Sequence, residues 1–353
     1  MTHPAPTLDS DSVLRNCGVD PDVLRSSIAR WMAITLDGTR RVVFAGSNPL
    51  IDAALAASPE ARPVVRYSLA AASALPAESY DLLVVIEDSP TPDAWAIIAS
   101  LAQRPRVQLV WEALRQDLLV SLMATKFQYL VTPEELLGLM RNAPGTSSRR
   151  LDRPIVKADA IESFQGKRVI EFGPLDGVQT AAIAKLGASE IVCIEIRPDN
   201  YLKSLLSADL IGARQVSIRF DNFHAVTAAR YGTFDICIAH GVYYHSNAPF
   251  RFLENIASLA PVVVFGGFCA TDASPAGDWM ELASEGQSYR AKQYAEVNYF
   301  TAGVSANGYF FGADAIQRWF RNHGFEICAL EVRSTTSKQP AGEFVFFVAK
   351  RAR

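Results

Sequence analysis

The residues with the clearest chemical potential lie in the stretch 167–200, where Gly173 and Gly177 follow one short apolar run and Glu195 ends the next. Glycines in a tight turn let a ligand approach the backbone, and the helix that follows directs its first N–H groups toward that ligand. An acidic residue about 20 positions further on can accept hydrogen bonds from ribose hydroxyls. This spacing predicts a nucleotide-binding strand–turn–helix–strand unit.

Two later apolar runs also end in polar residues. Residues 216–220 precede Asp221 and Asn222, and the run that starts near residue 234 leads to His240 and His245. The carboxyl ends of parallel strands meet at one edge of an open sheet, so we expect these side chains beside the glycine turn. Histidine titrates near neutral pH and can act as a general base for a hydroxyl acceptor. Capping of the following helix is the alternative role for His245.

The string Glu171-x-Gly173-x-x-x-Gly177 lacks the third glycine of the dinucleotide fingerprint and resembles the first motif of class I S-adenosylmethionine-dependent methyltransferases. The segment 233–259 resembles a second methyltransferase motif, in which a strand opening with Phe-Asp is followed by a small loop and a Tyr-His pair. The resemblance spans residues 155–350. It implies a seven-stranded Rossmann-like sheet with an antiparallel last strand, and S-adenosyl-L-methionine as the cofactor.

The resemblance also implies roles for individual residues. Glu195 would hold the ribose hydroxyls and Asp221 would face the adenine amino group. The full set of expected cofactor-binding residues is Glu171, Gly173, Asp176, Gly177, Glu195, Ile196, Asp221, Asn222 and His240. The candidate catalytic residues are His245 and His240, in that order.

Methyl transfer needs no protein nucleophile, so the remaining task is to orient the acceptor. The segment 266–311 is long and rich in aromatic residues, which favours a lid or a binding insert. The candidate substrate-contacting residues are Arg197, Tyr243, Tyr244, Tyr289, Arg290 and Tyr299.

The first half of the chain alternates between short apolar runs and helical patterns, which predicts a smaller doubly wound α/β unit with five parallel strands. The expected strands are 42–45, 64–67, 82–86, 107–111 and 129–131. Three strings resemble response-regulator receiver domains, but the phosphate-accepting aspartate position falls on Ile86. A pseudo-receiver and a generic flavodoxin-like unit both stay open. We expect domains at 1–141 and 155–353 joined by a linker at 142–154, and the first domain is a candidate homodimer surface.

The composition narrows the function classes. A formal charge of −3 over 353 residues does not favour a nucleic-acid partner. No apolar run reaches the ~20 residues that span a bilayer, so we expect a cytoplasmic protein without a membrane partner. The five cysteines form no C-x-x-C pair and the five histidines lack ligand spacing, so we expect no metal site.

Three functions therefore remain in view. The first is methyl transfer to an oxygen or nitrogen atom of a small polar molecule, such as a sugar or a natural-product intermediate. The second makes tRNA the acceptor, since the Gly-Val-x-Tyr-His string also resembles enzymes that modify wobble uridines. The third is a non-catalytic S-adenosylmethionine-binding partner or scaffold protein.

Overall fold

The computed structural model describes residues 21–36, 41–57, 65–86, 97–98, 100–110, 114, 153–296, 302–335 and 342–352. The predicted strand at 129–131, residues 142–152 of the predicted linker, and Tyr299 lie outside these ranges. The last two residues of that linker, 153 and 154, instead begin helix α9.

The first half contains a parallel sheet with the strand order β2-β1-β3-β4, which confirms four of the five predicted strands. The short helices α4 and η1 were not predicted. Ser68 is the N-cap of α4, and its Oγ accepts the N–H of Ala71 at 3.2 Å. The elements are β1 (Val42–Ala45), β2 (Val65–Tyr67), β3 (Leu82–Val85), β4 (Val107–Leu109), α2 (Pro21–Thr35), α3 (Pro49–Ala57), α4 (Leu69–Ser73) and η1 (Ala77–Ser79).

The second half is built on a seven-stranded sheet with the order β13-β14-β9-β8-β5-β6-β7. Strand β14 runs antiparallel to both of its neighbours, which confirms the predicted antiparallel last strand. The strands are β5 (Arg168–Phe172), β6 (Glu190–Glu195), β7 (Val216–Phe220), β8 (Ile236–His240), β9 (Val262–Cys269), β13 (Phe325–Thr335) and β14 (Gly342–Arg351).

Helices cover both faces of this sheet, because its central strands are buried on both sides and alternate their side chains between two cores. Phe172, Cys237 and Phe265 face the core under α13 and α14, whereas Val169 and Ile238 face the core under α9 and α10. The helical elements are α9 (Arg153–Asp159), α10 (Val178–Lys185), α11 (Pro198–Leu210), η2 (Phe223–Ala225), α12 (Ala228–Tyr231), η3 (Tyr243–His245), α13 (Pro249–Leu259) and α14 (Ala313–Asn322).

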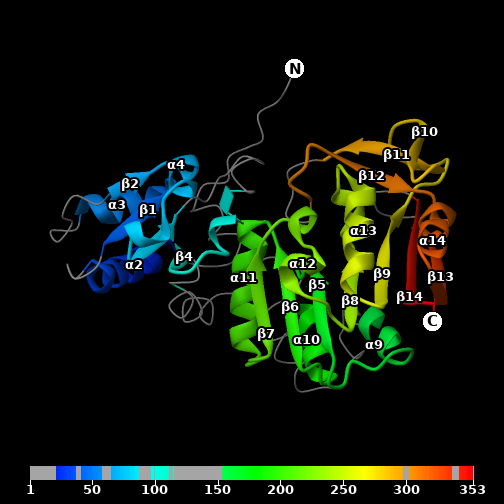
Figure 1. Cartoon of the computed structure of the whole chain (residues 1–353), viewed down its shortest axis with the longest axis horizontal. Helices are drawn as coiled ribbons and strands as arrows, with labels where there is room; N and C mark the ends of the chain where they lie inside the picture. Colours follow the sequence, from blue (N-terminus) through cyan, green and yellow to red (C-terminus); the bar gives the residue numbers. More distant parts are fainter. Residues whose placement is uncertain are drawn as a thin grey trace.

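The segment predicted as a long lid or insert is a second, three-stranded antiparallel sheet, made of β10 (Trp279–Ser284), β11 (Gln287–Ala295) and β12 (Asn307–Phe311). Figure 1 shows it at the upper right, next to β9 and α14. The sequence alone did not indicate strands in this segment. In the structure, buried Tyr289 and Ala291 alternate with exposed Arg290 along β11, as expected of a strand with one buried face. Strand β12 packs on η3, so the insert contacts the segment that follows β8.

The two halves share hydrophobic cores through helix α11. Leu202 and Leu206 pack in one cluster with Phe44 of the N-terminal sheet, and Tyr201 packs in another with Leu83. Figure 1 shows the N-terminal sheet, in blue and cyan, directly beside α11. The N-terminal half is therefore packed against the methyltransferase-like half.

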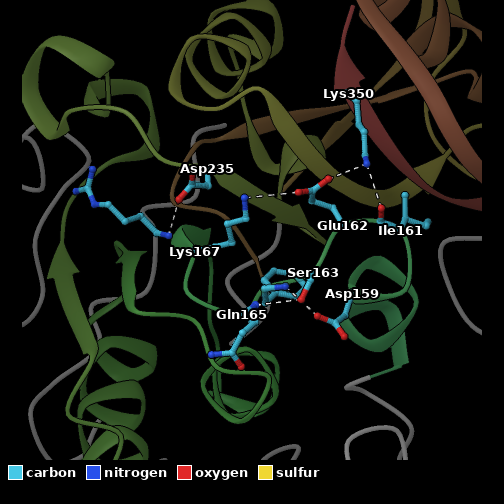
Figure 2. Close-up of polar contacts among 10 residues, drawn as sticks. Asp159, Ile161, Glu162, Ser163, Gln165, Lys167, Asp235 and Lys350 are labelled. Atoms are coloured by element: carbon cyan, nitrogen blue, oxygen red, sulfur yellow. Dashed lines mark hydrogen bonds and ion pairs between the residues drawn. The ribbon is translucent and has the colours of Figure 1, made fainter.

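Ion pairs of Glu162, in the segment between α9 and β5, link that segment to the carboxyl end of the antiparallel strand β14, as Figure 2 shows in close-up. Lys350 of β14 donates to Glu162 Oε2 at 2.7 Å and to the carbonyl of Ile161 at 3.0 Å. Lys167 lies 3.7 Å from the other carboxylate oxygen of Glu162. The Lys350 hydrogen bond is the main reason that the pKa of Glu162 is lowered. These contacts tie the segment after α9 to β14, at the end of the sheet opposite the glycine turn.

Among the described residues, no helix is long and apolar enough to cross a membrane.

Candidate active site

A cavity of about 470 Å³ lies at the carboxyl ends of β5, β6, β7 and β8. The edge of the sheet at which sequence reasoning expected the site therefore contains a pocket of the size that holds a small ligand. Among the predicted residues, its walls include Gly173, Asp176, Glu195, Ile196, Arg197, Asp221, His240, Tyr244 and His245.

The glycine turn after β5 forms one wall. Gly173 has φ +65°, and a Cβ there would lie 2.6 Å from Cγ1 of Val242, so only glycine lets the two segments approach. Leu175 also has a positive φ of 54°, which is strained for a branched side chain. Gly177 has φ +80° and is the N-cap of α10, outside the cavity lining. The backbone of this turn, from Gly173 to Leu175, therefore faces the cavity.

Helix α11 holds this turn in place. Lys203 forms an ion pair with Asp176, and the two side chains are 0% and 3% exposed. Ser204 Oγ donates to the carbonyl of Leu175 at 3.1 Å, and Ser207 Oγ donates to the carbonyl of Asp176 at 2.9 Å. Sequence reasoning missed these residues. No sequence signal marks them, because α11 also carries Asp199, Asn200 and Asp209 and its polar residues read as a solvated face.

Glu195 ends β6 with its carboxylate in a fixed orientation. Its Oε1 accepts the backbone N–H groups of Ile196 at 2.8 Å and Arg197 at 2.9 Å, and the side chain is buried in the cavity wall. Two backbone donors stabilise the charged form of a carboxylate in a partly apolar site. Glu195 is therefore pre-positioned to accept hydrogen bonds from a diol.

Asp221 is fully buried between two cavities. Its Oδ1 accepts the N–H of Asn222 at 2.7 Å, and its Oδ2 is paired with Arg230 at 3.0 Å and accepts the hydroxyl of Tyr231. Burial raises the pKa of Asp221, and these partners oppose the rise. Asn222, predicted to touch the cofactor, instead borders the second cavity and accepts the N–H of His224 at 2.9 Å.

Glu171 lies beneath the cavity rather than in its wall. It is 1% exposed, and its Oε2 accepts the hydroxyl of Thr180 at 2.6 Å. Burial raises its pKa to about 7. The structure therefore places this acidic residue of the first motif under the turn.

The ring of His240 lines the cavity, with Nδ1 2.9 Å from Nε2 of Gln179 and the ring packed beside Phe344 at 5.4 Å. Burial lowers the pKa of His240 to about 4, so its imidazole is neutral at pH 7. A base of that pKa has little driving force to take a proton from a hydroxyl. This environment suits a neutral wall residue better than a general base.

His245, at the end of η3, lies 2.6 Å through Nδ1 from Oε1 of Glu296, and the two side chains are 15% and 6% exposed. The hydroxyl of Tyr294 donates to the same oxygen at 2.6 Å. The backbone N–H of Gly303 also points at Nδ1, at 3.2 Å. The carboxylate oxygen of Glu296 is nearer to Nδ1 and carries negative charge, so we assign a proton to Nδ1 and a lone pair to Nε2. The pair resembles the carboxylate–imidazole arrangement in which the carboxylate sets the tautomer of a base. Sequence reasoning missed Glu296, which no motif marks.

The predicted substrate residues separate into two groups. Arg197 and Tyr244 line the cavity, and Arg197 Nη1 donates to the carbonyl of Ala302 at 3.4 Å. Three others lie away from it in this structure. Tyr243 is fully buried with its hydroxyl on the carbonyl of Phe268, Tyr289 is buried and accepts from Asn322, and Arg290 lies over the ring of Trp279, 4.0 Å from its centroid.

These walls fit a nucleoside with a charged tail. Gly173 presents backbone without a side chain to the cavity, Glu195 offers oriented acceptor atoms, and α10 starts at the turn. Among the described residues, no group of three or more His, Cys, Asp or Glu side chains could hold a metal ion.

The fold is that of a class I methyltransferase. It has a Rossmann-like seven-stranded sheet with an antiparallel strand β14, a glycine turn after β5, and an acidic residue at the end of β6. The chain belongs to a methyltransferase-domain family, whose sequence model matches residues 146–330, more than half of its length. It is an S-adenosylmethionine-dependent methyltransferase, and S-adenosyl-L-methionine is its cofactor.

Several solved structures are similar to this chain. The N-terminal domain of EvdMO1 with SAH bound is 24% identical over 57% of this chain and 81% of that chain, with a TM-score of 0.46. The same domain in the presence of SAH and D-fucose is 21% identical over 63% and 95%, with a TM-score of 0.47. Magnesium protoporphyrin IX methyltransferase from Synechocystis PCC 6803 with bound SAH is 14% identical over 62% and 93%, with a TM-score of 0.40. No curated protein matches the chain.

Proposed function

We propose that the protein methylates a hydroxyl oxygen of a small polar molecule, such as a sugar or a natural-product intermediate, with His245 as the general base. The observation that supports this proposal is the contact between His245, which lines the cavity, and Glu296, which does not. An amine or carboxylate acceptor needs only orientation. A hydroxyl acceptor gains from a base at the reacting oxygen, and His245 supplies one if Nε2 carries the lone pair, as assigned above.

The chain's own residues divide the work in a single displacement. The bound cofactor supplies an electrophilic methyl group on a sulfonium. We propose that Glu195 and the Gly173 turn bind the nucleoside, while His245 Nε2 accepts the proton of the acceptor hydroxyl as its oxygen bonds to the methyl carbon and the carbon–sulfur bond breaks. Glu296 then stabilises the imidazolium that forms, and the products are the methyl ether and S-adenosylhomocysteine.

The surroundings of His245 support a compact acceptor. Its ring packs beside Tyr244 and its Nδ1 meets the N–H of Gly303, and the same cavity wall includes Phe268 and Ala302. A Cβ on Gly303 would lie 2.7 Å from Cβ of His245, so the segment before β12 closes tightly on the base. Apolar walls around a reacting oxygen exclude water and strengthen the electrostatic contacts inside. A cavity of about 470 Å³ that also holds the cofactor leaves room for a small molecule.

The proposal is tested by incubating the full chain with S-adenosylmethionine and a panel of hydroxylated sugars and natural-product alcohols, with mass-spectrometric detection of the methyl ether. We expect turnover on a member of the panel, and a loss of roughly 100- to 10,000-fold in kcat for His245→Ala. His323→Ala, a change at a histidine at the C-terminal end of α14, is the matched control and should leave kcat unchanged.

Two results would contradict the proposal in different ways. Methylation of tRNA alone, with binding that weakens steeply as salt rises, would reassign the acceptor class. Tight cofactor binding with no turnover on sugars, alcohols or tRNA would favour a non-catalytic role.

A further inference from the structure

We infer that a second cavity, between the N-terminal half and the methyltransferase sheet, binds a small phosphorylated molecule. This cavity measures about 420 Å³ and shares Asp221 with the cofactor site as a common wall. Its lining includes polar side chains from both halves of the chain: Ser100, Gln103, Asn222, His224, Arg230 and Arg251. The inference does not rest on the identity of the methyl acceptor.

The charges in this cavity favour an anion. Two guanidinium groups face one carboxylate, and that carboxylate, Asp221, is already paired with Arg230 at 3.0 Å and is fully buried. Arg251 is exposed and has no hydrogen bond or ion pair among the residues that the structure describes. His224 adds no negative charge. Counting only the lining residues that the structure describes, cations exceed anions by one, and guanidinium groups bind phosphate oxygens through paired N–H donors.

Neutral donors complete the lining. Asn222 uses its Oδ1 to accept the N–H of His224, which leaves its amide NH₂ as the ligand-binding end of that side chain. Ser100 brings a hydroxyl and Gln103 an amide from the opposite wall, in the N-terminal half. Phosphate oxygens accept hydrogen bonds from all of these groups. The volume exceeds that of a bare phosphate ion and matches a phosphorylated small molecule.

His224 is a partly buried, neutral neighbour of Arg251 in this cavity. Burial, together with the nearby Arg251, lowers its pKa to about 4. Its Nε2 lies 3.2 Å from Oγ of Ser246, so the ring is held in place as a neutral wall. A dianionic ligand close to Arg251 would neutralise the charge of its guanidinium group. Among the described lining residues, no carboxylate pairs with Arg251.

The test is calorimetric titration of inorganic phosphate into the full chain loaded with S-adenosylhomocysteine, at constant ionic strength set with potassium chloride. We expect saturable binding that Arg251→Ala weakens on the order of tenfold or more, since a hydrogen bond to a charged group is lost. Arg214→Ala, at an exposed arginine before the amino end of β7, is the matched control and should bind phosphate as the wild type does.

A second pair of variants tests the opposite wall. Gln103→Glu brings a negative charge to the cavity at an exposed position and should abolish phosphate binding, whereas Gln103→Asn should retain it. No saturable binding of phosphate by the wild type overturns the inference. Equal binding by the wild type, Arg251→Ala and Gln103→Glu also overturns it, because phosphate would then bind elsewhere and the cavity would be a solvent-filled gap.

Discussion

Replacement of Glu296 by glutamine tests the proposed base most specifically. The substitution keeps the size of the side chain and a hydrogen-bond acceptor for Nδ1 of His245, but removes the negative charge that faces the imidazolium. The two groups are 2.6 Å apart and the carboxylate is 6% exposed, so the interaction is poorly screened by water. A charge-assisted hydrogen bond contributes about 1.5 to 3 kcal/mol. We therefore expect kcat to fall by roughly 10- to 150-fold.

The assay is initial-rate methylation at saturating S-adenosylmethionine, followed by mass spectrometry, with cofactor affinity measured by calorimetry. The loss should fall on kcat, because Glu296 contacts neither substrate in the proposed mechanism, and cofactor affinity should stay unchanged. Glu281→Gln, at an exposed carboxylate on β10 of the same insert, is the matched control. If Glu296→Gln retains wild-type kcat, or if it loses only cofactor affinity, the reasoning about the pair is refuted.

Three further perturbations follow from the site. Glu195→Ala should weaken S-adenosylhomocysteine binding by roughly 10- to 150-fold in calorimetry, whereas Glu190→Ala at the amino end of the same strand should not; equal affinities would remove Glu195 from the site. The folded pKa of Glu171, about 7, lies above its unfolded value of 4.5, so its protonated form stabilises the fold below pH 4.5 and that stability is lost as pH rises through 7. The free energy of unfolding of Glu171→Gln, measured with urea, should therefore rise relative to that of the wild type by on the order of 3 kcal/mol between pH 4.5 and pH 8. If the difference between the two proteins is the same at both pH values, Glu171 does not titrate in this range. Lys203→Met leaves Asp176 buried without its cation and should cost about 3 to 5 kcal/mol in urea unfolding, and wild-type stability would refute the brace under the turn.

The elements of the methyltransferase half could be predicted well because local signals agree with the tertiary fold. The predicted apolar strand at 216–220 matches β7, since that run is bounded by polar residues. The glycine turn and Glu195 were also predictable, because their spacing reflects the geometry of one strand–helix–strand unit. The common edge of the sheet then brought Asp221 and His245 to the same cavity.

Other parts of the site could not be predicted, because they depend on pairing between distant segments. Glu296 reaches His245 only because the antiparallel insert packs β12 on η3, and no sequence motif records that contact. Tyr243 and Tyr244 are adjacent in sequence, yet the turn of η3 buries the first and leaves the second in the cavity wall. The polar face of α11 resembles an ordinary solvated face until the turn that contains Asp176 packs over it.

The most direct measurement is a crystal structure of the full chain with S-adenosylhomocysteine. The account predicts the nucleoside at the Gly173 turn, its ribose hydroxyls on the carboxylate of Glu195, and its sulfur facing the space next to Nε2 of His245. A nucleoside bound elsewhere, or Nε2 of His245 hydrogen-bonded to the protein and turned away from the sulfur, would contradict it.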